Sequence, residues 1–306
     1  MGEMLDLVRK RRSVRTFDGR PLSEEDIATI RSFAKMADNP FGLPVEFRFL
    51  QGKEHGLSCP VVVGTDLYLG AKMKRVPEFE EAYGYSFEKL IMFLETLNIG
   101  TVWVGGTMNR DAFEKAIELT EEEVMPCMTP LGYTAQQMAM REKMMRKGVK
   151  ADKRKDFSEL FFCRDFNTPL TTENAAELGW SLGDALEMVQ WAPSAVNKQP
   201  WRLVFEEGKV HFFEKQDKGY VNHATGDLQR IDVGIAMYHF EMAMEEVGTE
   251  IAWKKEKPEI ALPEHVLYVA TARKDFCHKT FEERLAEHDG EISVCEFDWR
   301  EMSEEN

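Results

Sequence analysis

Residues 84–103 read GYSFEKLIMFLETLNIGTVW, and residues 232–253 read DVGIAMYHFEMAMEEVGTEIAW. Each stretch predicts an amphipathic helix followed by Gly-Thr and an apolar strand, because apolar residues recur at helical spacing before the glycine and cluster after it. The two Gly-Thr pairs, at 100–101 and 248–249, lie 148 residues apart. A helix and strand repeated in this way indicate an ancient duplication.

A second pair of landmarks gives nearly the same spacing. The pattern Arg-x-Phe occurs at 15–17 and again at 164–166, and Pro-Leu occurs at 21–22 and again at 169–170, so the spacings are 149 and 148 residues. Two separate anchors agree to within one residue. The sequence therefore predicts two related halves in one chain.

The predicted halves are residues 1–150 and residues 151–306, the second with a C-terminal extension. In the first half, Ser23 with Asp26 three residues later predicts the start of a helix. Short apolar runs predict strands in both halves, FRFLQG beside RLVFEEGKVHFFEK and, later, CPVVVGTDLYL beside EHVLYVATA. The second pair does not align at the spacing of 148 residues, which leaves the order of the strands in the two halves open. The basic stretch 140–160 predicts a solvated connecting helix, and Ile292, Val294 and Phe297 predict a short strand near the C-terminus.

Composition excludes several classes of function. The chain has 306 residues, 43% of them hydrophobic, and a formal net charge of −15 with its acids spread throughout. An attraction to nucleic acid or to an anionic membrane is therefore not expected. No apolar run approaches the roughly 18 residues of a membrane span, and the N-terminus lacks a signal-peptide pattern, so we expect a cytoplasmic protein. Five scattered cysteines without a Cys-x-x-Cys pair predict neither disulfides nor a metal site.

Two short segments carry residues suited to binding. In Arg11-Arg12-Ser13-Val14-Arg15, alternate residues of an extended chain would present two guanidinium groups and a hydroxyl on one side, which suits a phosphate or a flat heterocycle. The second segment is WAPSAVNKQPW, residues 191–201, which follows a predicted helix and precedes a strand. Its prolines, small residues and amides predict a rigid polar rim beside an apolar wall.

Together these segments resemble the nitroreductase family of flavoproteins, whose R-x-S-x-R segment and A-P-S-x-x-N-x-Q-P-W loop they match nearly residue for residue. The resemblance implies an α+β fold, a nitroreductase-like α/β sandwich. In that family FMN lies at the interface of a homodimer, between the R-x-S-x-R segment of one subunit and the loop of the other. We therefore expect FMN as cofactor and NADH or NADPH as electron donor.

The departures from the family pattern concern one copy of each motif. Where the first half should repeat the loop it has DNPFGLP at 38–44, and where the second should repeat R-x-S-x-R it has LFFCR at 160–164, which keeps only Arg164. Each half therefore retains what the other has lost. We expect an intramolecular pseudo-dimer with one surviving site, and hence a monomer.

The resemblance also implies roles for single residues. Arg11 and Ser13 would hold the ribityl phosphate, and Arg15 would stabilise negative charge on the reduced ring. A backbone N–H near Gly105 and Gly106 would donate to flavin N5, so these glycines and Arg15 are the expected catalytic positions. The full set of expected cofactor contacts is Arg11, Arg12, Ser13, Arg15, Val104, Gly105, Gly106, Arg154, Pro193, Ser194, Ala195 and Asn197.

The sequence leaves three functions open. The first is an FMN-dependent reductase that passes two electrons from NAD(P)H to a small electron-poor acceptor, such as a nitroaromatic or a quinone. The second is a non-catalytic protein that binds flavin or another small ligand, and the third is a scaffold in which both sites are lost. Trp103, Phe41 and Tyr133 are candidates for contact with the acceptor, although core packing is the simpler role for each.

Overall fold

The computed structural model describes residues 2–183 and 185–275, which leaves the expected strand around Ile292 outside the described residues. The helices are α1 (Glu3–Lys10), α2 (Glu24–Ala34), α3 (Gly52–His55), α4 (Phe79–Thr96), α5 (Arg110–Ala116), α6 (Met140–Gly148), α7 (Phe157–Leu160), α8 (Thr172–Glu177), α9 (Ala185–Trp191) and α10 (Leu228–Glu246). The strands are β1 (Glu46–Gln51), β2 (Leu67–Lys74), β3 (Ile99–Gly100), β4 (Glu123–Val124), β5 (Met128–Tyr133), β6 (Phe161–Cys163), β7 (Trp201–Glu206), β8 (Lys209–Lys215), β9 (Val221–Asn222), β10 (Gly226–Asp227), β11 (Ile251–Lys254) and β12 (Val266–Lys274).

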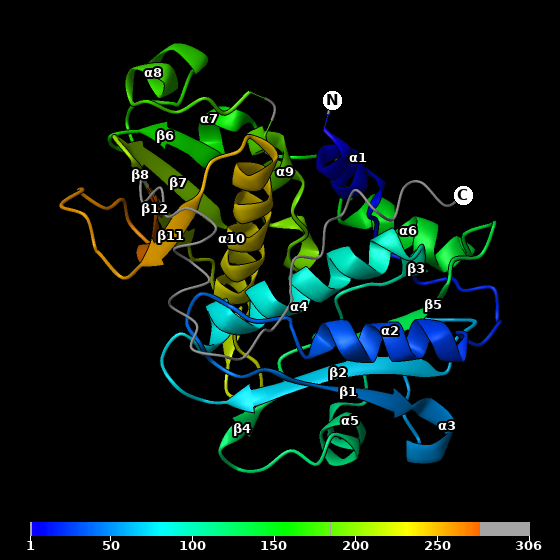
Figure 1. The fold of residues 1–306 in the computed structure, drawn as a ribbon. Coiled ribbons are helices and arrows are strands. Elements are labelled where there is room, and N and C mark those ends of the chain that lie inside the picture. The colour runs from blue at the N-terminus through cyan, green and yellow to red at the C-terminus, as the bar shows by residue number, and fades with distance from the viewer. Residues whose placement is uncertain (1, 184, 276–306) are drawn as a thin grey trace, which may run out of the picture. The chain divides into compact units, whose positions relative to one another are not determined.

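The first sheet has the order β1-β2-β5-β3 with antiparallel neighbours, and the short β4 pairs with β2. Side chains alternate between its faces, as strand geometry requires. Phe47 on β1 contacts Phe87 of α4, whereas Leu50 joins a core cluster with Phe113 of α5. Helices therefore cover both faces of this sheet (Figure 1).

The second sheet has the order β11-β12-β8-β7-β6, in which only β6 and β7 run parallel. Apart from β6, its strands follow the same scheme as β1-β2-β5-β3. In both sheets the strands stand in the order first, second, fourth and third along the chain, and a long helix separates the second from the third. The two predicted halves thus share one topology.

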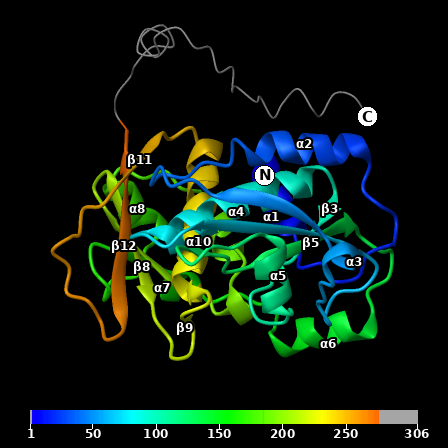
Figure 2. The same ribbon diagram turned by 90° about the horizontal axis from the view of Figure 1, so that it is seen from below.

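The long helices α4 and α10 pack against each other at the centre of the molecule (Figures 1 and 2). A side chain at Gly84 would place its Cβ 2.1 Å from the carbonyl oxygen of Ile231, and one at Gly234 would lie 2.2 Å from that of Glu81. Only glycine allows so close a backbone approach. The contact is reciprocal, because Gly234 lies 150 positions after Gly84 and Ile231 lies 150 positions after Glu81.

The structure corrects two expectations about the strands. RLVFEEGKVHFFEK forms the two strands of a hairpin, β7 and β8, because Gly208 adopts a φ of 65° in the turn between them. The counterpart of β2 is therefore β8. The apolar run at 264–272 belongs to β12, whose counterpart is β5, so its expected pairing with CPVVVGTDLYL is wrong.

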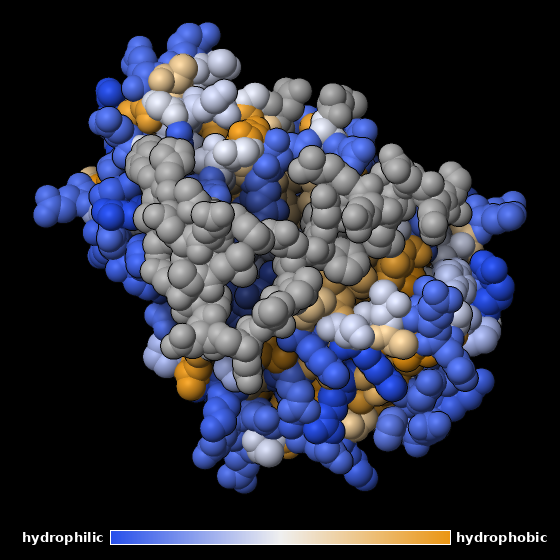
Figure 3. Space-filling model, in the orientation of Figure 1, coloured by the Kyte–Doolittle hydropathy of each residue, from blue (hydrophilic) through white to orange (hydrophobic). Residues whose placement is uncertain are grey.

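The expected connecting helix at 140–160 is also shorter than predicted. α6 ends at Gly148, a loop follows, and α7 begins at Phe157. The start of α2 is as expected, since the Ser23 side chain accepts a hydrogen bond from the Asp26 N–H at 3.0 Å. Most of the described surface visible in Figure 3 is hydrophilic. Within the described ranges, no helix is both long enough and apolar enough to cross a membrane.

Candidate functional site

A cavity of about 500 Å³ lies where the two predicted halves meet. Its wall combines the N-terminal segment, the loop after β3, the segment after α6 and the loop after α9. All of the residues expected to contact the cofactor line this one cavity: Arg11, Arg12, Ser13, Arg15, Val104, Gly105, Gly106, Arg154, Pro193, Ser194, Ala195 and Asn197.

Three arginines give the cavity an unusual electrostatic character. In Arg11, Arg15 and Arg154 the guanidinium Nε is buried and has no hydrogen-bond partner among the described residues. Burial lowers the pKa of all three side chains, and it brings the pKa of Arg154, which also feels repulsion from Arg11, to about 10. Buried donors without acceptors are costly, so this arrangement favours an anionic ligand.

The N-terminal segment is extended, as its alternating residues predict. Ser13 forms a parallel bridge with Thr101, and the Val14 N–H donates to the Thr101 carbonyl at 2.8 Å. The Val14 side chain is buried on the other side. Alternation therefore turns Arg11, Ser13 and Arg15 toward the same cavity, in agreement with the sequence.

Glu142 anchors this segment, a role that sequence analysis missed. The side chain is 2% exposed and accepts hydrogen bonds from Arg12 Nη1 at 2.9 Å, the Arg15 N–H at 3.2 Å and Thr16 Oγ1 at 2.7 Å. Arg12, although it lines the cavity, thus forms an ion pair with a protein carboxylate. The sequence shows Glu142 only as one acid in a basic helix, with nothing to indicate its partners 126 to 130 residues away.

The loop after α9 is held by its own polar side chains. Ser194 Oγ accepts from the Gln199 N–H at 2.9 Å, and Gln199 Nε2 donates to the Asn197 carbonyl at 3.1 Å. Val196, Asn197 and Gln199 adopt φ values of 43°, 61° and 47°. Left-handed backbone at a β-branched residue such as Val196 is strained, and strain of this kind is often found at functional sites.

Asn197 and Trp191 place Arg154 in the cavity wall. The Asn197 amide donates to the carbonyls of Lys150 at 2.9 Å and Lys153 at 3.0 Å, so it fastens the segment after α6. Arg154 stacks over the Trp191 ring at 4.4 Å and donates to its carbonyl at 3.3 Å. The Asn197 amide nitrogen is thus bonded within the protein, and the expected contact of Asn197 with the ring stays a prediction.

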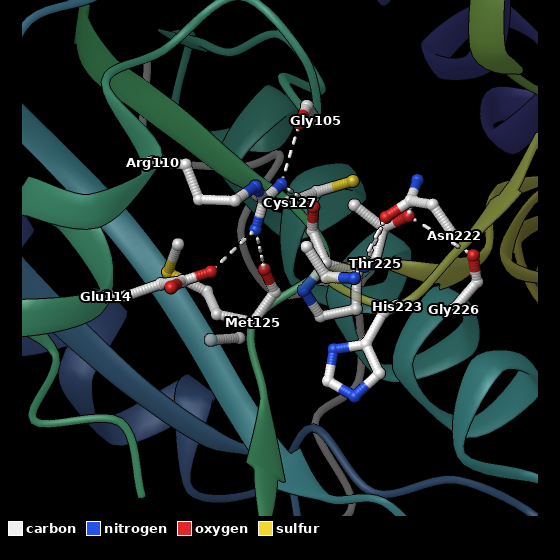
Figure 4. Close-up of polar contacts among 12 residues, drawn as sticks. Gly105, Arg110, Glu114, Met125, Cys127, Asn222, His223, Thr225 and Gly226 are labelled. Carbon is white, nitrogen blue, oxygen red and sulfur yellow. Dashed lines mark hydrogen bonds and ion pairs between the residues drawn. The ribbon is translucent and has the colours of Figure 1, made fainter. Parts of the chain in front are cut away.

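The loop after β3 is fixed by Arg110, a second residue that sequence analysis missed. Its guanidinium donates to the carbonyls of Gly105 at 2.7 Å, Pro126 at 2.9 Å and Met125 at 2.8 Å, as Figure 4 shows in part. The Val104 N–H donates to Met128 at 2.9 Å. An N–H for a ligand at this point would therefore come from the glycines that follow.

Trp103 forms an apolar part of the wall and is also packed from behind. Its Nε1–H donates to Glu88 Oε2 at 2.7 Å, and Glu88 Oε1 lies 2.9 Å from His239 Nε2. Both Glu88 and His239 are fully buried. Phe41, by contrast, packs against the core, and Tyr133 lines a different cavity.

The described residues contain no group of three His, Cys, Asp or Glu side chains placed to hold a metal ion. The cavity is characterised by its arginines, its glycine loop and its strained loop. Each of these three features comes from a different segment of the chain.

Comparison with known proteins identifies the family to which the chain belongs. A family model described as "Putative TM nitroreductase" matches residues 3–244. A crystal structure of a "putative nitroreductase" from Thermotoga maritima superposes with a TM-score of 0.56 at 18% identity, covering 90% of this chain and 93% of that one, so the expected α+β fold is confirmed.

Two further solved structures cover less of the chain. A nitroreductase family protein from Clostridium difficile 630 has 15% identity and a TM-score of 0.39, over 47% of this chain and 91% of its own. An FMN-dependent nitroreductase from Clostridium difficile R20291 has 15% identity and a TM-score of 0.38, over 43% and 88%. No curated protein matches the sequence.

Proposed function

We propose that this chain, which belongs to the nitroreductase family whose model matches residues 3–244, is an FMN-dependent oxidoreductase. It would pass two electrons from NADH or NADPH to an electron-poor acceptor. Nitroaromatics and quinones are acceptors of this class. The observation that carries the proposal is that the side chains of Arg11, Arg15 and Arg154 line one cavity while the buried Nε of each has no hydrogen-bond partner among the described residues.

The cavity suits FMN in charge and size. A phosphate offers several acceptor oxygens and two negative charges, which would satisfy buried Nε–H groups and offset the mutual repulsion of Arg11 and Arg154. A volume of about 500 Å³ falls in the range of cofactor pockets. The residues that would hold the phosphate are Arg11, Ser13 and Arg154.

Bound FMN would supply the hydride chemistry, and the chain would supply binding and electrostatics. Arg15, a half-buried cation, would stabilise negative charge on the ring edge. At Gly106 a Cβ would project into open space, with no atom within 4 Å. The lack of a side chain there would leave room for the ring to approach the backbone. Arg110 would hold this loop in place before the ligand arrives, through its bond to Gly105.

We also propose that the single site arises from duplication and acts within one monomeric chain. Two observations support this proposal: the shared strand order of the two sheets and the reciprocal contact of Gly84 and Gly234. Such a contact is the intramolecular equivalent of the isologous interface of a symmetric dimer. The cavity takes its arginine segment from residues 1–150 and its strained loop from residues 151–306.

The proposal is tested by adding FMN to the purified protein, desalting it and recording the visible spectrum. We expect about one retained FMN per chain, and we expect Arg11→Glu to abolish retention because it places a negative charge against the phosphate. Two FMN per chain would contradict the single-site proposal. Failure of the unaltered protein to retain FMN would overturn the FMN assignment.

Catalysis is tested separately, because the unrepeated loop at 38–44 also suits a flavin-binding protein without turnover. Under anaerobic conditions, NADH or NADPH should bleach the bound flavin, and a quinone or nitroaromatic should restore its absorbance. Flavin that is retained but bleached by neither donor would instead establish the binding protein.

A further inference from the structure

Asp232 is an acid in the wall of this largely cationic cavity. It lies in the second turn of α10 and is 4% exposed. Its two carboxyl oxygens lie 3.1 and 3.0 Å from the N–H of Ala195, which belongs to the strained loop. The expected site residues did not include Asp232, because an acid at the start of a helix is a common structural feature.

The surroundings of Asp232 disfavour its ionised form. Burial raises the pKa of Asp232 well above its usual range, the Ala195 N–H lowers it, and the nearby acids Asp227, Glu214 and Glu88 raise it further. These acids stand at three separate places, the N-cap of α10, β8 and α4. Cys127, which also lines the cavity and whose thiol interacts electrostatically with Asp232, is a titratable group next to the start of β5.

A neutral carboxyl group in this position has one donor to satisfy. The contact recorded for its side chain within the protein is with Ala195, whose N–H donates and so uses acceptor capacity of the carboxyl. The O–H therefore remains to be matched by an acceptor, and the cavity is the space in which a ligand could provide one. A carboxylic acid kept neutral in an enzyme site commonly serves to donate a hydrogen bond.

We propose that Asp232 is a carboxylic acid that donates its O–H to an acceptor atom of the heterocycle bound in the cavity. This inference rests on the proposed function, in which the heterocycle is the flavin ring. The Asp232 side chain would then contact both the ring, through its O–H, and the loop at 193–199, through the Ala195 N–H. When Gly84 is matched to Gly234, the position of Asp232 corresponds to Ala82 in the first half, so this acid is present in one half only.

Infrared difference spectroscopy tests the inference without measuring turnover. The protein at pH 7 should show a carboxylic C=O band that is missing from Asp232→Asn, and this band should move to lower frequency when FMN binds. Glu214→Gln is the matched control, since Glu214 is a buried acid on β8 held by Arg230. It should leave the moving band in place.

The outcomes separate this inference from the proposed function. FMN that binds while no Asp232-dependent band exists, or while that band does not move, would overturn the inference alone. If the protein binds no FMN, both fall together. A second readout is affinity: Asp232→Asn retains a donor and should bind FMN within about threefold of the original, whereas Asp232→Leu should bind about tenfold more weakly.

The stability of the FMN-free protein gives a third readout, with a definite sign. The folded chain holds a proton on Asp232 that the unfolded chain releases above the ordinary Asp pKa of about 3.9. The contribution of this proton to the stability of the folded chain is therefore complete below about pH 4. As the pH rises from there toward the pKa of the folded state, the unfolding constant increases by about tenfold per pH unit. The unfolding constant of the original protein should rise with pH relative to that of Asp232→Asn. If the unfolding constant of the original protein, divided by that of Asp232→Asn, stays flat or falls as the pH rises, the inference is contradicted.

Discussion

The loops at 193–199 and 38–44 lie before the corresponding strands β7 and β1, after the helices α9 and α2, yet they differ in strain. The first holds Val196, Asn197 and Gln199 in left-handed backbone, whereas the second turns at Gly42, whose φ of 63° carries no such penalty. The second loop is also satisfied locally, with Asn39 bonded to Leu43 at 2.7 Å. The strained backbone therefore lies in the loop that lines the cavity.

The two arginine segments, 11–15 and 160–164, also differ in that only the first keeps energetically costly features. Arg15 lies in the cavity wall with a buried Nε that lacks a described partner, whereas its counterpart Arg164 is exposed to solvent. Before Arg164 the chain forms the buried strand β6, parallel to β7. On the duplication proposed above, one copy of each motif keeps costly features and the other forms ordinary structure, which is the pattern expected when only one copy is under functional constraint.

The largest expected effect comes from the contact that both halves share. Gly234→Ala would place a Cβ 2.2 Å from the Glu81 carbonyl oxygen, a backbone atom within α4 that cannot move alone. We expect a loss of unfolding free energy of about 3 kcal/mol or more, as for severe overpacking. Urea unfolding followed by circular dichroism measures it.

Gly148→Ala is the matched control, since a Cβ at the end of α6 meets no atom within 4 Å. It should change the stability by less than about 1 kcal/mol. Equal losses in the two variants would show that the close approach of α4 and α10 is not what the glycine provides.

A smaller effect should separate the two arginine segments. Arg15→Met removes a half-buried cation. A hydrogen bond from a charged group contributes about 1.5–3 kcal/mol, so its loss should weaken FMN binding by about 10- to 150-fold. The same change should stabilise the FMN-free protein, because it removes the desolvation cost that lowers the pKa of Arg15. Titration of FMN by fluorescence, with thermal unfolding, measures both quantities.

Arg164→Met provides the comparison on the other side. Since Arg164 is exposed, its replacement should leave both FMN affinity and stability nearly unchanged. Equal weakening of FMN binding by the two variants would contradict the asymmetry between the halves.

Much of the fold follows from local sequence. Capping residues predict the start of α2, an apolar run predicts the strand β1, and helical spacing predicts the two long helices. All three signals act over a few residues. The pairing of CPVVVGTDLYL with EHVLYVATA failed because RLVFEEGKVHFFEK, taken as one strand, forms the two strands β7 and β8. The next apolar run in the second half therefore corresponds to β5 and not to β2. Family membership was recognised from the two motifs and is confirmed by the family model.

The site could be predicted only in part. The motif residues do gather at one cavity, although the role of each stays a prediction. Glu142, Arg110 and Asp232 gave no signal, because their partners are distant in sequence or are backbone atoms that no pattern of residue types identifies. A buried carboxylate and a solvated one look the same in a sequence until folding decides what surrounds them.

The smallest effect tests the strain itself. Val196→Asn should raise the stability by about 1 kcal/mol, because Asn tolerates left-handed backbone whereas a β-branched residue does not, and because Val196 is 59% exposed and loses little burial. Val221→Asn is the control: Val221 is 57% exposed in the strand β9, where Val is favoured, so this variant should lose a few tenths of a kcal/mol. Urea midpoints that fall together in both variants would mean that the loop carries no strain at Val196, and the contrast with the relaxed loop at 38–44 would then lie in the arginines alone.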